Sequence, residues 1–129
     1  MTEHPSPTVT HAVWSQLPFE HVSPGITRQT LHASQQSVIR YVYAPGSNFP
    51  IHQHPEEQVT LVVSGQIEFT VADERLVMGA GEVAVIAPNV PHGARVIGTE
   101  TVETFNILSP RRGTNPLAQQ NSGDGVRGE

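Results

Sequence analysis

The chain has 129 residues, which is enough to bury one hydrophobic core and too few for two ordinary domains. It carries 7 Lys and Arg against 12 Asp and Glu, a formal net charge of -5, so it lacks the positive charge that binding to a nucleic-acid backbone requires. The absence of cysteine excludes disulfides, thiolate catalysis and cysteine-ligated zinc.

The two ends of the chain differ in composition from its middle. Residues 1–10 are rich in Pro, Ser and Thr, and residues 113–129 are polar and rich in Gly, so we expect a mobile N-terminal segment and a disordered tail on either side of one domain at 11–112. The first segment has no apolar run of the signal-peptide kind, and no stretch reaches the length of a membrane span. We therefore expect a cytoplasmic protein with no membrane partner.

Short β-branched and aromatic runs, separated by turn residues, fill the middle of the chain. The first two runs are GITRQTLHA (25–33) and SVIRYVYA (37–44), and Pro45-Gly46 then begins a turn that continues to residue 50. Further strands are expected within 58–65, 66–78 (a hairpin turning at 72–74), 79–97 and 99–108. No segment keeps a helical period. About eight or nine short strands at this spacing predict an all-β sandwich or barrel.

The stretch HQHPEEQ (52–58) carries the first candidate site residues. Side chains two or four positions apart on a strand share a face, so His52 and His54 point the same way if this segment is extended, and Gln58 has the same parity. A histidine pair in this pattern can bind a metal. It can also be the half-exposed polar face of a strand.

A second cluster lies in APNVPHGAR (87–95). Pro88 and Pro91 fix φ and stiffen the turn that delivers His92, which lowers the entropy cost of holding its imidazole in place. If the strand after His92 pairs beside the strand that begins at Gln58, this imidazole meets the first cluster. Three imidazoles and one amide oxygen would leave open positions on a metal, as a catalytic site requires. A histidine after proline is also common in ordinary turns.

Both clusters resemble the two sequence motifs of the cupins. The first motif is matched by PGSNFPIHQHPEEQVTLVVSG (45–65) and the second by GEVAVIAPNVPHG (81–93). The resemblance implies an all-β, single-domain cupin, which is a double-stranded β-helix or jelly-roll barrel. It also implies a metal site with the ligands His52, His54, Gln58 and His92. Gln58 stands where the motif usually has Glu, and Glu56 and Glu57 are weaker candidates for that ligand.

A ligand set of this kind carries no negative charge. A divalent transition metal held by it keeps nearly its full charge and pulls strongly on a substrate oxygen, which favours Lewis-acid chemistry on a carbonyl or an enol. Iron oxygenases with two histidine ligands normally add a carboxylate, although three-His iron dioxygenases are known among cupins. The ligands suit Fe, Mn, Ni, Co or Zn alike.

A narrower resemblance is to the small cupins that ketonise unsaturated monouronates from pectin or alginate breakdown, and it rests on LPFE, SPGITRQTL, IRYVYAPGSNFPIHQHPEEQVT and FNILSPRR. In that family an Asp and an Arg, six residues apart around a Ser-Pro, serve beside the metal. The Arg position matches Arg112, whereas the Asp position holds Asn106, which cannot act as a base at neutral pH. The family also tends to carry an Arg at the position of Arg40. This residue could grip a substrate carboxylate, or it could face solvent from its strand.

We therefore expect a metal-dependent enzyme that polarises a carbonyl or enol oxygen of a small anionic molecule, in a ketonisation, isomerisation or cyclisation of an unsaturated-uronate-like substrate. Arg112 and Arg40 would position the anion, and Asn106 would orient the substrate or a water. A three-His dioxygenase and a cupin that only binds a small ligand are the alternatives. The resemblance further implies a homodimer paired through an edge strand.

Overall fold

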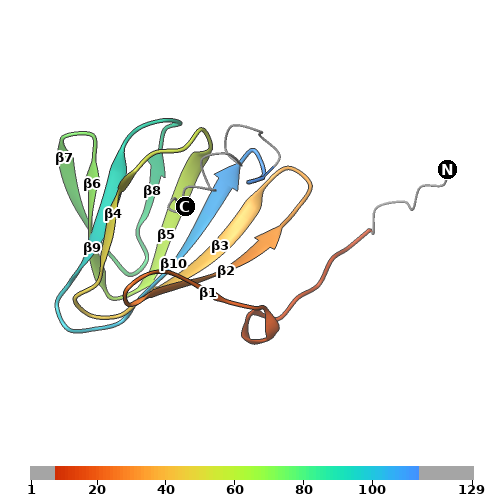
Figure 1. The fold of residues 1–129 in the computed structure, drawn as a ribbon, viewed down its shortest axis with the longest axis horizontal. Helices are drawn as coiled ribbons and strands as arrows, with labels where there is room; N and C mark the ends of the chain where they lie inside the picture. Colours follow the sequence, from red (N-terminus) through yellow and green to blue (C-terminus); the bar gives the residue numbers. More distant parts are fainter. Residues whose placement is uncertain (1–7, 114–129) are drawn as a thin grey trace.

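The computed structural model describes residues 8–113 and confirms the all-β fold (Figure 1). Its elements in chain order are η1 (Trp14–Gln16), β1 (Glu20–Ser23), β2 (Ile26–His32), β3 (Ser37–Tyr43), β4 (Asn48–His52), β5 (Glu57–Ser64), β6 (Gln66–Val71), β7 (Glu74–Gly79), β8 (Val83–Ile86), β9 (His92–Ile97) and β10 (Val102–Ser109). Within the described residues the strands form two sheets, in the orders β1-β2-β3-β10-β5-β8 and β4-β9-β6-β7. Every pairing is antiparallel, as expected for a β-sandwich closed into a barrel.

The region before His52 differs from the sequence-based expectation. A turn was expected as far as residue 50, but β4 already begins at Asn48. The reversal is completed early because Gly46 adopts a φ of +82°, a conformation that glycine takes without steric cost. β4 then pairs with β9 through Asn48↔Arg95 and His52↔His92, which places two histidines opposite each other.

Neither η1 nor β1 was predicted from the sequence. β1 is only four residues long, and its burial shows no alternation. It is fixed by pairing with β2, in which Glu20 lies opposite Arg28 and the two side chains form an ion pair of 2.9 Å. The expected mobile segment at 1–10 and disordered tail at 113–129 fall almost wholly outside the described residues.

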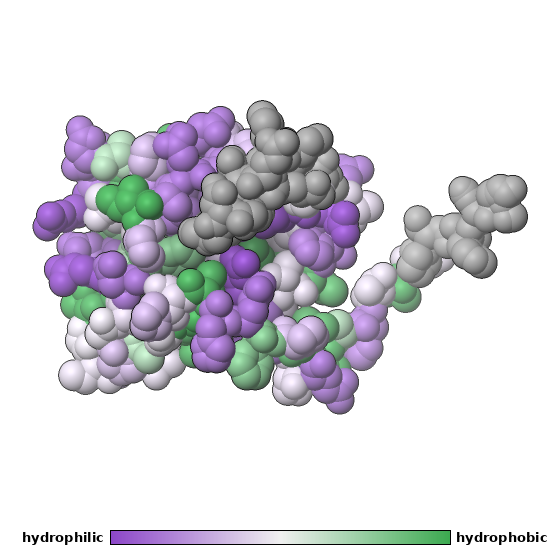
Figure 2. Space-filling model, viewed as in Figure 1, coloured by the Kyte–Doolittle hydropathy of each residue, from purple (hydrophilic) through white to green (hydrophobic). Residues whose placement is uncertain are grey.

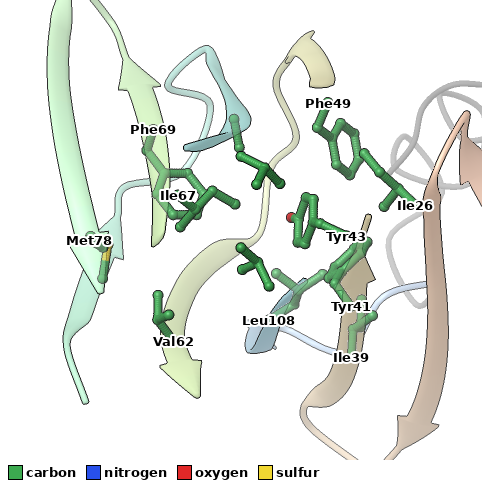
Figure 3. Close-up of a cluster of buried hydrophobic side chains, with 13 residues drawn as sticks. Ile26, Ile39, Tyr41, Tyr43, Phe49, Val62, Ile67, Phe69, Met78 and Leu108 are labelled. Carbon is green, nitrogen blue, oxygen red and sulfur yellow. The ribbon is translucent and has the colours of Figure 1, made fainter. Parts of the chain in front are cut away.

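The hydrophobic core lies between the two sheets (Figure 3). β3 and β10 are neighbours in the middle of the larger sheet, and along both strands buried and half-buried residues alternate. Their buried side chains, such as Ile39 and Leu108, meet Ile67, Phe69 and other residues of the smaller sheet. Two-residue periodicity in the sequence therefore translates directly into an inner and an outer face.

The register of β10 decides which of its side chains face the interior. Asn106 pairs with Ile39 on β3 and with Thr60 on β5, and all three are buried. The next pair along the two strands, Phe105 and Arg40, has the opposite parity, so both side chains lie on the outer face. Phe105 is covered there by Trp14 of η1, with ring centroids 5.4 Å apart.

Polar side chains dominate the face of the molecule shown in Figure 2. On the outer side of the larger sheet, β5 and β8 keep four aliphatic side chains exposed, namely Leu61, Val63, Val83 and Val85. Among the described residues, no helix has the length and hydrophobicity needed to cross a bilayer.

We predict that Gly65→Ala destabilises the protein more than Gly46→Ala. Both glycines have positive φ, +80° and +82°, so both substitutions carry a left-handed backbone cost of about 1–2 kcal/mol. At Gly65 the new Cβ would also lie 2.7 Å from Val102 Cγ2 and 2.8 Å from the Thr101 carbonyl oxygen, whereas no described atom lies within 4 Å of it at Gly46. The clash adds about 1–3 kcal/mol. Urea unfolding of the two variants measures the difference, and equal losses would contradict this account.

Candidate metal centre

Three histidines from two separate segments converge at one end of the barrel. His52 ends β4, His54 lies in the loop before β5, and His92 begins β9. Their ring centroids are 4.4 Å apart for His52 and His92, 4.9 Å for His54 and His92, and 5.6 Å for His52 and His54. One nitrogen of each ring lies within 4.8 Å of the corresponding nitrogen of the other two, close enough for a shared ion.

Main-chain carbonyls hold all three imidazoles in the same tautomer. In each ring Nδ1 lies at hydrogen-bond distance from a carbonyl oxygen two residues away in the chain. The acceptors are Pro50 for His52 (2.8 Å), Glu56 for His54 (3.1 Å) and Val90 for His92 (2.8 Å). Because a carbonyl oxygen can only accept, Nδ1 carries the hydrogen and Nε2 carries the lone pair. Neutral imidazole with an Nε2 lone pair is a metal-binding form of histidine.

Gln58, the second residue of β5, lies beside these imidazoles. Its Oε1 lies 3.2 Å from His54 Nε2, and its amide NH₂ donates to Thr60 Oγ1 at 2.8 Å. As placed, Oε1 and the Nε2 of His54 both present a lone pair, and a cation bound to both atoms would satisfy them. The donor set therefore fits a divalent cation.

A proton on His54 is a poor substitute for that cation. Burial lowers the pKa of His54 most, the positive charge of Arg112 and the other two imidazoles lower it further, and the result is a pKa of about 3. His54 is therefore neutral near pH 7, with its Nε2 lone pair directed at Gln58. Both lone pairs therefore remain available to a metal cation near pH 7.

The turn that precedes His92 is tied to the loop that carries His54. The Asn89 N–H donates to the His54 carbonyl at 2.8 Å, and the Ala72 N–H donates to the Pro91 carbonyl at 2.9 Å. Asn89 has a φ of 64°, a left-handed conformation that Asn tolerates better than most residues. As the sequence indicated, Pro91 restricts the chain just before His92.

A small cavity of about 10 Å³ lies among these side chains, room for about one water or an ion. Its walls include His52, Gln58, His92 and Asn106, together with the aromatic residues Tyr43, Phe49 and Phe69. Asn106 lines this cavity, and its Oδ1 is buried with no hydrogen-bond donor among the described residues. This oxygen is placed to accept a hydrogen bond from a molecule in the cavity.

A second cavity, of about 210 Å³, flanks the first on the side of β6 and β8. Val71 and Ile86 in its wall are the cross-strand partners of His92 and Gln58. Phe69 lines both cavities. Glu74 and Arg75 also line the larger cavity.

Arg40 is not brought to the imidazoles, and its expected role as a clamp for the substrate is wrong. It lies on the outer face of β3, where its Nε is 2.6 Å from Glu103 Oε2 and its Nη1 donates to Gln29 Oε1 at 2.7 Å. The arginine has the opposite parity to the inward-facing Ile39 and Tyr41. Gln29 in turn donates to the carbonyls of Trp14 and Leu17, so Arg40 helps to attach the N-terminal segment to the sheet.

Arg112 lies at the margin of the site, beside Glu56, which we considered above only as a weaker candidate ligand. Its Nη2 is 3.6 Å from Glu56 Oε1, and its backbone N–H donates to Ser37 Oγ at 2.9 Å. Glu56 is completely buried, on the Nδ1 side of His54 and outside the group of three imidazoles. Glu57, the other weaker candidate, is exposed.

Comparison with protein families places this geometry in a known group. A family model described as the cupin domain matches residues 39–108, more than half of the chain. The chain belongs to the cupin family. The matched segment contains all three histidines, Gln58 and Asn106, and ends before Arg112.

Among curated proteins, this cupin is 46% identical over 85 residues to the H2HPP isomerase of Bacillus subtilis. The match covers 65% of this chain but only 36% of the relative, so the cupin spans little more than a third of that protein.

Among solved structures, it resembles an RmlC-like cupin from Shewanella frigidimarina NCIMB 400 (TM-score 0.74, 24% identity, 82% of this chain and 95% of that one). It also resembles KdgF from Halomonas sp. (TM-score 0.73, 24% identity, 82% and 97%). At this level of identity the two structures support the fold.

We predict that the metal-free cupin loses stability as the pH falls from about 6.5 to about 3. His54 has a folded-state pKa lowered to about 3, whereas the unfolded chain takes up this proton near the ordinary histidine pKa of 6.5. The contribution of the neutral imidazole is therefore complete above pH 6.5 and is lost as the pH falls through this window.

Chemical denaturation in EDTA across this pH range measures the effect. The slope should flatten in His54→Gln and persist in the surface variant His21→Gln. An unchanged slope in His54→Gln would show that other groups are responsible.

Proposed function

We propose that this cupin is a metal-dependent enzyme whose metal ligands are His52, His54, Gln58 and His92. The observation that carries the proposal is the common tautomer of the three imidazoles, together with the acceptor oxygen of Gln58 facing His54 Nε2. The ligand types suit a divalent transition metal such as Fe, Mn, Ni, Co or Zn. Bound by four uncharged groups, such an ion supplies Lewis-acid polarisation of a substrate carbonyl or enol oxygen.

The protein's own residues would bind and orient a small anionic molecule. Arg112 provides a positive charge at the margin of the site, and the buried Oδ1 of Asn106 would accept a hydrogen bond from a substrate hydroxyl or a water. Aromatic walls at Tyr43, Phe49 and Phe69 restrict the water that can reach the reacting oxygen. Since an amide does not act as a base at neutral pH, Asn106 orients and does not transfer the proton.

The reaction class that fits is ketonisation, isomerisation or cyclisation of a carbonyl compound. A relative at 46% identity is named an isomerase, which favours this class over others. The second cavity, at about 210 Å³, is smaller than the roughly 300–1,000 Å³ of drug-sized pockets. It therefore suits a small molecule, such as one with a single ring. An unsaturated-uronate-like substrate is our first candidate.

We predict that His92→Ala loses the bound metal and reduces turnover at least about 100-fold, because it removes one of the three imidazole ligands. Metal content after loading with each divalent ion, measured by mass spectrometry, and the decay of the conjugated absorbance of an unsaturated uronate are the two readouts. His21→Ala, on β1, is the matched control and should behave as the wild type. Turnover that survives in His92→Ala would refute a metal-dependent mechanism.

We predict that Asn106→Asp raises ketonising activity by about 100-fold or more, because a carboxylate at this inward position can take up and return a proton. The same ultraviolet assay measures the gain. Asn106→Ser, which also removes the amide but adds no base, should show no such increase. A rate for the Asp variant no higher than that of the wild type would show that the reaction needs no base at this position.

A three-His dioxygenase is the second candidate, because the described residues bring three imidazoles together. The absence of a carboxylate from this group weakens an oxygenase of the two-histidine, one-carboxylate type. The two functions differ in one measurement, because only a dioxygenase consumes oxygen when substrate is added to the iron-loaded protein. Tight binding of a small ligand with neither oxygen uptake nor chemical change would instead indicate a cupin that only binds.

A further inference from the structure

The carboxyl group of Glu56 is buried beside the candidate metal centre in an unusual way. None of the residue's surface is exposed, and neither carboxyl oxygen has a hydrogen-bond partner among the described residues. Its Oε1 lies 3.4 Å from His54 Nδ1 and 3.6 Å from Arg112 Nη2. The carboxyl group therefore lies between the back of one imidazole and a guanidinium.

Burial of a carboxylate without hydrogen bonds costs several kcal/mol unless opposite charge lies near it. Arg112 offers one positive charge at a longer distance than a close ion pair would have. His54 directs its Nδ1 hydrogen to the main-chain carbonyl of Glu56 and its Nε2 to Gln58, so no hydrogen bond from this imidazole reaches the carboxyl group. A divalent ion on the other side of His54 would complete the compensation.

We propose that Glu56 is a positioning residue that supplies the negative charge missing from the four neutral ligands, acting through the Nδ1–H of His54. This inference rests on the proposed metal site. The main-chain carbonyl of Glu56 accepts the Nδ1 hydrogen and fixes the ring, while the carboxylate of the same residue, 3.4 Å from Nδ1, would strengthen the lone pair on the opposite nitrogen by its charge. The sequence motif does not predict this role, since it assigns the position of the ligating Glu to Gln58.

The same carboxylate connects the metal ligand to Arg112. Its neighbours are His54 on one side and the guanidinium on the other, so a single side chain restrains a group that would hold the ion and a group that would meet the anionic substrate. The expected charge order is positive at the ion, negative at Glu56 and positive at Arg112. This order gives opposite signs for the effects of removing Glu56 and of removing Arg112.

The test compares Zn²⁺ affinity, measured by chelator competition, in Glu56→Gln and Glu57→Gln. The two variants remove one charge each from adjacent positions, the first buried and the second exposed. Glu56→Gln should weaken Zn²⁺ binding by about 10–100-fold, and Glu57→Gln should stay within about twofold of the wild type. The thermal midpoint of the metal-free protein should not fall in Glu56→Gln, because a purely structural role would lower it. Equal affinities in the two variants would overturn the inference.

Arg112→Met provides an independent measurement if Glu56→Gln fails to fold. Removal of a positive charge near Glu56 should strengthen Zn²⁺ binding several-fold, and unchanged or weaker binding would overturn the proposed charge order. Failure of the wild type itself to bind Zn²⁺, Co²⁺ or Fe²⁺ would instead refute the proposed metal site. The two failures are therefore distinguishable.

Discussion

Hydrogen bonds from imidazole N–H groups to main-chain carbonyls are the constraint on which the whole site depends. Each of the three histidines gives its Nδ1 hydrogen to a carbonyl two residues away. A carbonyl cannot rotate or titrate, so the backbone itself determines which nitrogen keeps the lone pair. The tautomer that leaves Nε2 free to bind a metal is thus set by local chain geometry at the end of β4, in the following loop and before β9.

The site holds a largely buried pair of opposite charges within a chain of negative net charge. The sequence carries a net charge of -5, and beside the three imidazoles the Arg112 guanidinium lies 3.6 Å from the Glu56 carboxyl group. A cation bound by the imidazoles would make this region positive overall and would attract an anionic molecule. Glu56 is the buried negative group in the immediate surroundings of His54, which gives its position unusual electrostatic weight.

Much of this arrangement could be predicted because a strand has a period of two. Parity related His52 to Gln58, and the cupin motifs supplied the rest of the grouping. The pairing considered for His92, beside the strand that begins at Gln58, is not the observed one, because β9 pairs with β4 and β6. Arg40 shows where such reasoning ends. Parity separates two faces but does not say which is inner, and pairing with Glu103 and Gln29 decides that Arg40 lies outside. Glu56 was considered only as a weaker ligand, and its position behind His54 could not be predicted because it lies in the loop before β5, where no period applies.

The hydrogen bond from Asn89 to the carbonyl of His54 has a consequence for how this cupin can diverge. It joins two segments, each bearing a candidate ligand, that are more than thirty positions apart in the chain. An inserted or deleted residue in either segment would displace both imidazoles at once, so the lengths of these segments must change together or remain the same. Variation in substrate is therefore expected to arise in the cavity walls of β6 and β8, whose side chains can be exchanged without moving a ligand.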